Sequence, residues 1–444
     1  MASISSIQSL TLDIPPSCIA FVPEYPNYFV VGTYLLEPSE GTLITKTDDD
    51  AGPEAAGTIA SSDGVQRNST KPEVEQKRSG SVILFKIDQD RISLVQTIQT
   101  PFAILDIQFR PLHESSDSAS VSEPKILPDE HNTPYGSLSD VESKRKRDSR
   151  PALAAATSTG SVALYRFDLS TSSLHEERLL QYFDASVLVL SCAWCPSSRD
   201  TLGVTLSDGR VMMCETDARA GPEENHCMQR LQHSLEAWTM AYSMTPHGGI
   251  FSGGDDAVLQ FWTSEDVEGS MVDVSWKDRR IHSAGVTAIL PLTGNIVVTG
   301  SYDDRIRVIR APHRGRREVL AELNLGGGVW RIKLMKAVGD GEGTERYENG
   351  TRNNEGTDSV ETPCREVARY TLLASCMHAG TRIVVLTHLA DDSWTADVLA
   401  RFEEHGSMNY GSDFRPGVPA DSPQTIVSTS FYDRLLCLWK SVPA

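Results

Sequence analysis

The sequence has no apolar run long enough to cross a bilayer, which takes about 18 to 20 residues, so it predicts no transmembrane helix and no membrane partner. Positive charge is also scarce, because Lys and Arg number 41 against 60 Asp and Glu and the formal net charge is −19. A protein that follows nucleic-acid phosphates needs a basic face, so direct nucleic-acid binding is not expected. The acidic balance permits a cationic partner, although acidic insertions that only maintain solubility would give the same composition.

Cysteine is sparse and poorly placed for cross-links. The 444 residues include 8 cysteines, and only Cys192 and Cys195 are closely spaced. Because this pair lies on an apolar strand pattern with no second pair nearby, we expect buried thiols rather than a metal site or a disulfide framework. A reducing, cytoplasmic compartment fits this cysteine usage best, and neither a metal nor a cofactor is expected.

Three motifs of common enzyme classes are missing from the sequence. GxSxG, HExxH and GxxxxGK[ST] do not occur. They would mark a serine nucleophile, a zinc site and a phosphate-binding loop, respectively. Standard hydrolase, metalloprotease and nucleotide-binding functions therefore have no local support.

What the sequence does contain is a repeated strand. Short alternating or apolar runs recur, mostly after tight-turn signals such as SDG or SYDDR and mostly about 48 residues apart. They are GSVILF (80–85), GSVALY (160–165), GRVMMC (209–214), AVLQFW (257–262), RIRVIR (305–310), TRIVVL (381–386) and RLLCLW (434–439). A unit of this length is typical of a four-stranded propeller blade. We predict an all-β, seven-bladed WD-repeat β-propeller over residues 1–444, in which a segment near residues 10–15 completes the last blade.

Polar insertions interrupt the repeat at about residues 37–79, 113–150 and 337–366. Their composition, rich in Ser, Asp, Glu, Gly, Asn and Thr, supplies too little apolar surface to offset the entropy of ordering. We expect all three to be disordered loops.

Another strand precedes each repeated run and would be the innermost strand of its blade. IHSAGVTAILP, which begins near His282, shows the usual pattern of a histidine followed by apolar residues. HGSMNYGSDFRP (405–416) keeps the histidine at His405 and the proline at Pro416, but its middle is polar. We expect the histidines to be structural, whereas buried polar groups on an innermost strand need partners from protein, water or ligand.

An aspartate recurs in the tight turn after the strand that follows the innermost strand. It is found at Asp208, Asp256, Asp304 and Asp433. A buried carboxylate needs hydrogen-bond partners, so these aspartates are expected to be structural. In three of these turns, the residue directly before the aspartate would point onto one face of the ring. Another blade lacks the aspartate, and one residue of its turn would point onto the same face. These residues are Asp255, Asp303, Tyr432 and His378. They are either solvated turn residues or, as a set, an anionic and partly aromatic mouth.

Trp330 follows three glycines in GGGVWRIK (326–333) and would enter an innermost strand near the channel. Glycines allow close backbone approach or unusual φ angles. The tryptophan either packs in the core or forms an aromatic wall for a cationic ligand.

Several of these motifs together resemble one family. They are FSGGDDAVLQFW (251–262), VTGSYDDRIRVIR (298–310), GGGVWRIK, ASCMHAG (374–380), HGSMNYGSDF (405–414) and STSFYDRLLCLWK (428–440). In this order and approximate spacing they resemble the WD-repeat diphthine methylesterases, which are also called diphthine methyltransferases. The resemblance covers roughly residues 249–440, and the N-terminal half supports only the propeller.

The resemblance implies an activity that the fold alone does not. The family hydrolyses the methyl ester of methylated diphthine, a modified histidine of translation elongation factor 2 that bears a trimethylammonium group. The reaction releases methanol and leaves diphthine, which is later amidated to diphthamide. The alternative is a non-catalytic WD-repeat scaffold that binds a protein partner at the propeller mouth.

The resemblance also directs attention to particular side chains. Ester hydrolysis needs a nucleophile or an activated water, a base, and donors for the oxyanion. Ser407 is the candidate nucleophile, and Asp413 or His378 the candidate base for a water. Tyr410 or Asn409 would donate to the oxyanion. The candidates for binding the quaternary ammonium are Trp330, Tyr432, Asp255 and Asp303.

Overall fold

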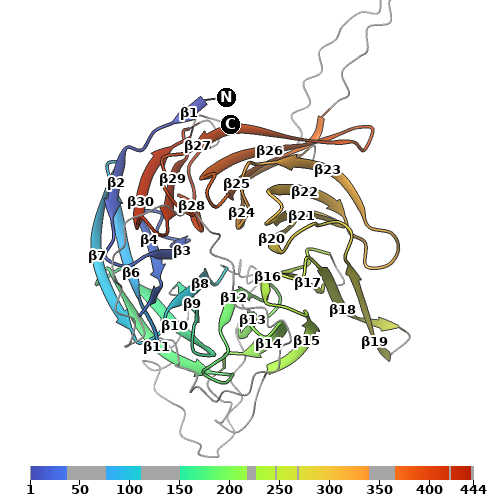
Figure 1. Ribbon diagram of the computed structural model, residues 1–444, viewed down its shortest axis with the longest axis horizontal. Helices are drawn as coiled ribbons and strands as arrows, with labels where there is room; N and C mark the ends of the chain where they lie inside the picture. The colour runs from blue at the N-terminus through green and yellow to red at the C-terminus, as the bar shows by residue number, and fades with distance from the viewer. Residues whose placement is uncertain are drawn as a thin grey trace, which may run out of the picture.

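The computed structural model describes residues 2–37, 77–111, 151–217, 227–245, 248–267, 270–339, 366–419 and 422–441. Seven antiparallel four-stranded units are arranged in a ring, which confirms the predicted all-β, seven-bladed propeller (Figure 1). The described residues form no helix long and apolar enough to span a membrane. The three expected insertions fall almost entirely outside the described residues.

The first three blades follow one another along the chain. Blade 1 comprises β3 (Pro16–Phe21), β4 (Tyr28–Thr33), β6 (Arg78–Asp88) and β7 (Arg91–Thr100), with the short β5 (Leu35–Leu36) also paired to β6. Blade 2 comprises β8 (Ile104–Phe109), β9 (Ala152–Thr157), β10 (Ser161–Asp168) and β11 (Ser173–Gln181). Blade 3 comprises β12 (Val189–Trp194), β13 (Thr201–Leu206), β14 (Arg210–Glu215) and β15 (Cys227–Gln232).

The next two blades repeat the same order from the centre outward. Blade 4 comprises β16 (Ala237–Tyr242), β17 (Ile250–Gly254), β18 (Leu259–Val267) and β19 (Ser270–Asp278). Blade 5 comprises β20 (Val286–Pro291), β21 (Ile296–Ser301), β22 (Arg305–Arg310) and β23 (Glu318–Asn324).

The last two blades incorporate the beginning of the chain. Blade 6 comprises β24 (Arg331–Gly339), β25 (Glu366–Ser375), β26 (Thr381–Leu389) and β27 (Trp394–Phe402), and β1 (Ala2–Ile4) adds to β27 in parallel. Blade 7 comprises β28 (Gly411–Phe414), β29 (Thr425–Ser430) and β30 (Leu435–Lys440), with β2 (Gln8–Thr11) as its outermost strand. This antiparallel pairing of β2 with β30 closes the ring, as the sequence predicts, and it brings the two termini close together (Figure 1).

Apolar side chains between neighbouring blades form the core, as expected for strands that are buried on both faces. Every residue of β3, β4, β9 and β29 is buried. Trp439 of blade 7 is 1% exposed and stacks on Phe402 of blade 6 with ring centroids 4.9 Å apart. Neighbouring blades are therefore packed tightly against each other.

Most inner strands carry a β-bulge near their start. The pairing with the second strand shifts by one residue in five of them, and the extra residues are Ser17, Leu105, Leu190, Trp238 and Thr287. A bulge re-aims one side chain and increases the local twist. Trp330 and Tyr410 directly precede β24 and β28 and occupy the corresponding position in blades 6 and 7.

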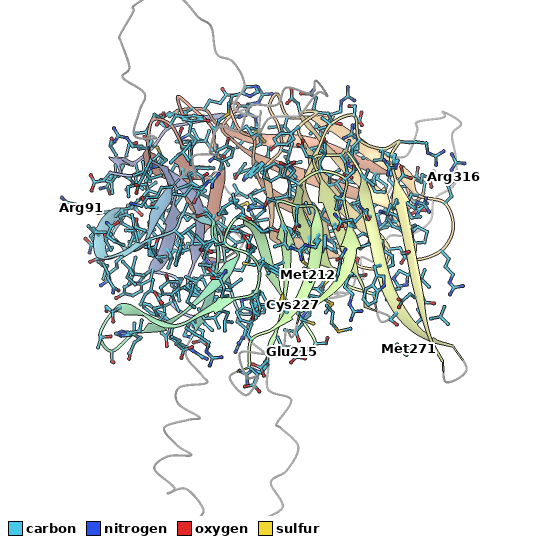
Figure 2. All side chains as sticks on the ribbon, turned by 60° about the horizontal axis from the view of Figure 1, so that its bottom comes forward. Arg91, Met212, Glu215, Cys227, Met271 and Arg316 are labelled. Atoms are coloured by element: carbon cyan, nitrogen blue, oxygen red, sulfur yellow. A yellow bond between two sulfur atoms is a disulfide. The ribbon has the colours of Figure 1, made fainter. Side chains whose placement is uncertain are left out.

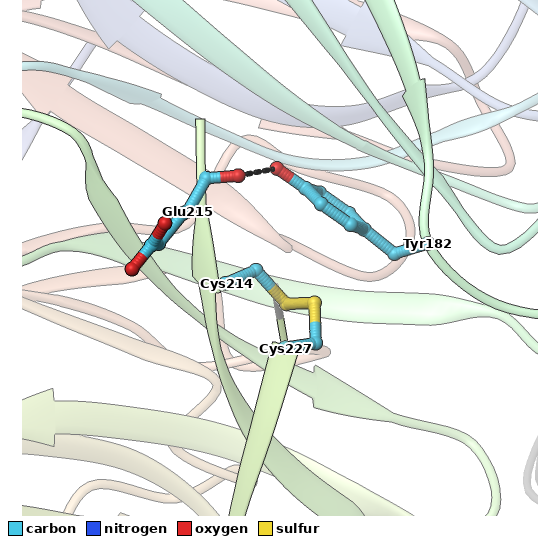
Figure 3. The surroundings of a disulfide bond; sticks show 4 residues. All are labelled: Tyr182, Cys214, Glu215 and Cys227. Atoms are coloured by element: carbon cyan, nitrogen blue, oxygen red, sulfur yellow. Dashed lines mark hydrogen bonds between the residues drawn. A yellow bond between two sulfur atoms is a disulfide. The ribbon is translucent and has the colours of Figure 1, made fainter. Parts of the chain in front are cut away.

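One disulfide is present, although the cysteine spacing suggested no disulfide framework, and Cys192 and Cys195 are free thiols as expected. Cys214 and Cys227 lie opposite each other on β14 and β15, with Cα atoms 4.1 Å apart, and their sulfurs are bonded (Figure 3). Cys227, labelled in Figure 2, lies on β15, the outermost strand of blade 3. The sequence could not reveal this pair, because only the strand register brings the two residues together. The five remaining cysteines among the described residues are free thiols, and four of these are buried.

Removing this disulfide should lower stability without unfolding the propeller. The two cysteines are separated by 13 residues, and a cross-link over such a loop is worth about 2 to 4 kcal/mol through restriction of the unfolded chain. We expect Cys214→Ser with Cys227→Ser to lower the free energy of unfolding by this amount in urea titration. Dithiothreitol should destabilise the wild type similarly and leave the double variant unchanged. Equal stability of wild type and variant under non-reducing conditions would contradict the expectation.

Candidate functional site

A continuous group of aromatic rings from blades 4 to 7 lies at one end of the central channel, where the inner strands begin. Ring centroids lie 5.5 Å apart for Trp238 and Trp330, 5.9 Å for Tyr302 and Trp330, and 5.0 Å for Trp330 and Tyr410. The series continues from Tyr410 to Phe431 at 5.4 Å, and from Phe431 to Tyr432 at 5.1 Å. We call these rings the aromatic mouth, which consists of Trp238, Tyr302, Trp330, Tyr410, Phe431 and Tyr432.

Two positions that recur in the blades supply most of these rings. The first is the start of the inner strand, which contributes Trp238, Trp330 and Tyr410. The second is the turn between the second and third strands of the blade, where a backbone N–H donates to a carbonyl near the start of the inner strand. This bond is formed by Tyr302 to Gly285 at 2.9 Å and by Phe431 to Met408 at 2.9 Å. The rings converge because the positions recur, although the residues are far apart in sequence.

Carboxylates lie beside the rings in blade 4. Asp255 occupies the same turn position as Tyr302, since its N–H donates to the Glu236 carbonyl at 2.9 Å, and its Oδ1 accepts the Trp238 Nε1–H at 3.0 Å. Burial raises the pKa of Tyr302, and the nearby Tyr410, Asp255 and Glu236 raise this pKa further. The mouth is thus aromatic and anionic, as expected for a site that attracts cations.

In blade 5 the register of the turn differs by one residue from the sequence expectation. Asp303, rather than Asp304, is the structural aspartate, because it accepts the Ser283 N–H at 3.1 Å and pairs with Arg307 at 2.9 Å. The Asp303 side chain is only 7% exposed, whereas Asp304 takes the left-handed φ of 65°. Asp303 is therefore engaged inside its own blade, and Tyr302 faces the mouth instead.

The structural aspartates expected in blades 4 and 7 are found in that role. Asp256 accepts from the N–H of Ser234 and lies 2.9 Å from His233 Nδ1. Although burial raises its pKa, the hydrogen bonds from His233 and Ser234 outweigh burial and lower the pKa to about 2. Asp433 accepts the Gly406 N–H at 2.9 Å in the equivalent contact of blade 7.

The polar middle of the 405–416 segment is largely satisfied within the protein. Asn409 is fully buried, its Nδ2 donates to the carbonyls of Gly411 and Thr429, and its Oδ1 accepts from the hydroxyls of Thr381 and Ser412. The Ser412 hydroxyl also contacts Ser375 of blade 6 at 3.0 Å. Asn409 and Ser412 thus join blades 6 and 7 through buried hydrogen bonds, and Asn409 does not reach the channel surface.

Asp413 lies deeper in the channel than the aromatic mouth. Its Oδ2 accepts the Phe21 N–H at 2.8 Å and pairs with Lys333 Nζ at 2.9 Å, and its Oδ1 accepts the Phe414 N–H. Lys333 also donates to the Ile19 carbonyl at 3.3 Å. Blades 1, 6 and 7 therefore meet at this carboxylate, and both of its oxygens are engaged.

Tyr410 is part of the mouth, Ser407 contacts the backbone of Tyr432, and His378 follows Met377, which pairs with Asn409. The Ser407 Oγ accepts the Tyr432 N–H at 2.9 Å and the Met408 N–H, so its described hydrogen bonds come from the backbone and not from a base. Burial, followed by the nearby Tyr432, raises the pKa of Tyr410 to about 12, which keeps its phenol protonated. His378 is exposed in the turn between β25 and β26.

Deeper in the channel, Arg331 forms an ion pair that the sequence did not suggest. Its Nη2 lies 3.2 Å from Asp106 Oδ1, and its guanidinium carbon lies 5.7 Å from the centroid of the Trp330 ring. The other end of the channel opens into a cavity of about 530 Å³, which Asp106, Arg331, Lys333 and Asp413 help to line. No metal-binding group of three or more His, Cys, Asp or Glu side chains occurs in the described parts of the chain.

Sequence comparison gives the chain a family. No protein-family model matches it. Diphthine methyltransferase of Schizosaccharomyces pombe is 31% identical over 293 residues, which cover 65% of this chain and 75% of that relative. The Saccharomyces cerevisiae protein of the same name is 25% identical over 69% of this chain and 84% of its own length. A Dictyostelium discoideum homologue is 21% identical over 96% of this chain and 97% of its own length.

This chain belongs to the diphthine methyltransferase family. Membership supports a role in diphthamide biosynthesis. The names of the relatives indicate that this role is enzymatic.

The segments that carry the family resemblance meet beside the mouth. Met377 of CMHAG forms an isolated antiparallel bridge with Asn409 of HGSMNYGSD. The glycines of GGGVW allow this contact, because a Cβ on Gly327 would lie 2.4 Å from the Cys376 carbonyl oxygen and one on Gly328 would lie 2.6 Å from Met377 Sδ. The three glycine-rich or polar segments therefore form one structural unit, although they are far apart in sequence.

Sequence reasoning missed Trp238, Tyr302, Phe431, Glu236 and Arg331. For Trp238 a signal was available, because a tryptophan stands at the place that Trp330 occupies in its own blade. Tyr302 could have been found by aligning SYDD with GGDD one residue differently. Arg331 gave no signal, because its partner Asp106 lies on another blade and is brought to it only by the tertiary structure.

Two buried histidines should make the protein sensitive to acid. Burial lowers the pKa of His282 and His405 from 6.5 to about 4. The unfolded chain therefore binds more protons than the folded protein between pH 6.5 and 4, and the free energy of unfolding falls as the pH falls through this window, by about 3 kcal/mol for each histidine. Urea titrations across this range should show a smaller slope for His405→Gln than for wild type. Met271→Ala, which replaces an exposed residue that does not titrate, should keep the wild-type slope.

Asn409 should be required for folding more than for catalysis. Replacing it with alanine removes four buried hydrogen bonds and leaves their partners unsatisfied, so we expect Asn409→Ala to lower the free energy of unfolding by about 2 to 4 kcal/mol. The exposed His378→Ala should change it by less than about 0.5 kcal/mol. An Asn409→Ala variant as stable as wild type in thermal and urea unfolding would show that this network contributes little.

Proposed function

We propose that this protein hydrolyses the methyl ester of methylated diphthine on translation elongation factor 2, releasing methanol and diphthine. The observation that carries the proposal is the aromatic mouth with Asp255 at its edge. A trimethylammonium group cannot lose its charge or donate a hydrogen bond, so it is recognised by aromatic faces and nearby carboxylates. The family to which the chain belongs takes its name from a substrate that bears this group.

The residues around the mouth support attack by water better than covalent catalysis by serine. A serine nucleophile needs a base within hydrogen-bond reach, whereas the described bonds of Ser407 Oγ come from backbone N–H groups. The base for a water is then His378 in the CMHAG turn rather than Asp413, because both oxygens of Asp413 are engaged. Tyr410, whose phenol stays protonated, would donate to the oxyanion.

The acidic balance of the chain supports a cationic target. The net charge of −19 would favour approach of a cationic side chain, and added salt would screen this attraction. Association with the modified factor should accordingly slow as the ionic strength rises.

Mass spectrometry of the modified factor tests the activity directly. Purified protein incubated with the methyl-ester form of the factor should release methanol and lower the mass of the factor by one methylene group. His378→Gln should slow this reaction strongly, and Ser407→Ala should retain most of it. Binding of the factor without any change in mass would favour the non-catalytic scaffold instead.

The aromatic mouth should control substrate affinity. Cation–π contacts are worth about 0.5 to 2 kcal/mol each, so Trp330→Leu and Trp238→Leu should each raise KM about 2- to 30-fold with a smaller effect on kcat. Tetramethylammonium chloride should inhibit the wild type competitively, and the two variants less. Met271→Ala, at a 67% exposed position near the end of the β18–β19 hairpin, is the control (Figure 2). Unchanged KM in both tryptophan variants would argue against recognition by the mouth.

A further inference from the structure

Arg331 occupies the boundary between the aromatic mouth and the deeper channel. It is the first residue of β24 and follows Trp330, the ring at the centre of the mouth. Its guanidinium carbon lies 5.7 Å from the centroid of that ring. Burial raises the pKa of Tyr302, and the nearby positive charge of Arg331 partly opposes this rise. It also lines the cavity of about 530 Å³ on the other side. A group that enters the mouth far enough to pass the rings would meet this side chain.

Most of the hydrogen-bonding capacity of Arg331 is uncommitted. A guanidinium has five N–H donors, and the one acceptor that the described residues place within ion-pair distance is Asp106 Oδ1, at 3.2 Å. Its side chain is 18% exposed, so it is largely withdrawn from bulk water but still accessible from the channel. The remaining donors are suited to a carbonyl oxygen or a carboxylate, which guanidinium groups bind with two parallel hydrogen bonds.

Asp106 holds the guanidinium in place. It is 4% exposed, and its Oδ2 accepts the Cys192 N–H of blade 3 at 3.2 Å while Oδ1 faces Arg331 of blade 6. The pair therefore joins opposite sides of the ring through a rigid inner strand. A donor fixed in this way loses little free energy to reorganisation when charge develops on a bound oxygen.

We propose that Arg331 binds the carboxyl group of the substrate, while the aromatic mouth binds its quaternary ammonium, and that Asp106 is the positioning residue for Arg331. This inference rests on the proposed function. In the reaction the water oxygen bonds to the carbonyl carbon, the bond to the methoxy oxygen breaks, and methanol leaves with one proton. The second proton of the water goes to solvent, and the product keeps a carboxylate. Arg331 interacts with the carbonyl oxygen in the substrate and more strongly with the oxyanion and the product carboxylate.

The site then distinguishes substrate from product by charge. An ester carries no negative charge and binds Arg331 weakly, whereas the carboxylate product forms an ion pair with it. The product should therefore inhibit the wild type and should bind more tightly than the ester. The cavity beyond Arg331 offers space for water and for the departing methanol.

The test uses the single variants Arg331→Gln and Arg331→Lys and one double variant. The double variant combines Asp106→Asn and Arg331→Gln, so that no buried charge is left unpaired. Each is assayed for kcat, KM and inhibition by the carboxylate form of the factor, after circular dichroism has shown that it is folded. Arg331→Gln and the double variant should lose about 10- to 1000-fold in kcat/KM and most of the product inhibition. Arg331→Lys should recover part of both. Arg310→Gln, on the outer part of blade 5, is the matched control and should match wild type.

The outcomes separate this inference from the proposed function. If the wild type releases methanol and Arg331→Gln keeps both wild-type kcat/KM and wild-type product inhibition, the role of Arg331 is overturned while the esterase activity stands. If the wild type releases no methanol, the proposed function fails, and direct binding of the carboxylate form still tests Arg331. Equal affinity of wild type and Arg331→Gln for that form would then overturn the inference as well.

Discussion

Closure of the ring is the constraint on which the rest of this structure depends. β2 pairs with β30, so that Gln8 lies opposite Leu438 and the beginning of the chain becomes the outer strand of the last blade. Blades 1 and 7 are thereby held in contact, and their inner strands come close enough for Asp413 to accept the Phe21 N–H. Lys333 completes this junction from blade 6. The channel and the aromatic mouth keep their shape because no blade has a free side along which to separate.

The repeat also explains why one end of the channel can be specialised. Each blade presents one residue at the start of its inner strand and one in the following turn, so the ring offers a fixed set of positions around the axis. In blades 4 to 7, Trp238, Trp330 and Tyr410 fill three of the inner-strand positions and blade 5 has Thr287, whereas blades 1 to 3 have Ser17, Leu105 and Leu190 there. Most of the aromatic mouth therefore comes from the half of the chain that carries the family motifs, and Tyr34 of blade 1, in the equivalent turn, lies 6.2 Å from Phe431 beside it.

The two charged parts of the channel differ in kind. At the mouth the carboxylates of Asp255 and Glu236 lie beside aromatic rings, which favours a permanent cation. Deeper in, Arg331 and Lys333 are paired with buried aspartates, which favours oxygen atoms that carry or develop negative charge. A side chain with a quaternary ammonium at one position and an ester at another is complementary to this arrangement. The fold provides the positions, and a few side chains determine the chemistry.

The sequence alone determined the architecture, because blade repeats, tight-turn signals and the histidine–aspartate frame are local patterns that recur with a fixed period. It also located the unusual segment at 405–416, but it could not assign Asn409 its partners, which lie on blade 6 as well as on its own blade. Only the tertiary structure decided that Asp303 turns inward while Tyr302 faces the mouth, and that Arg331 approaches Asp106. These outcomes depend on contacts between residues far apart in the chain, and a one-residue shift in a turn reverses which side chain points inward.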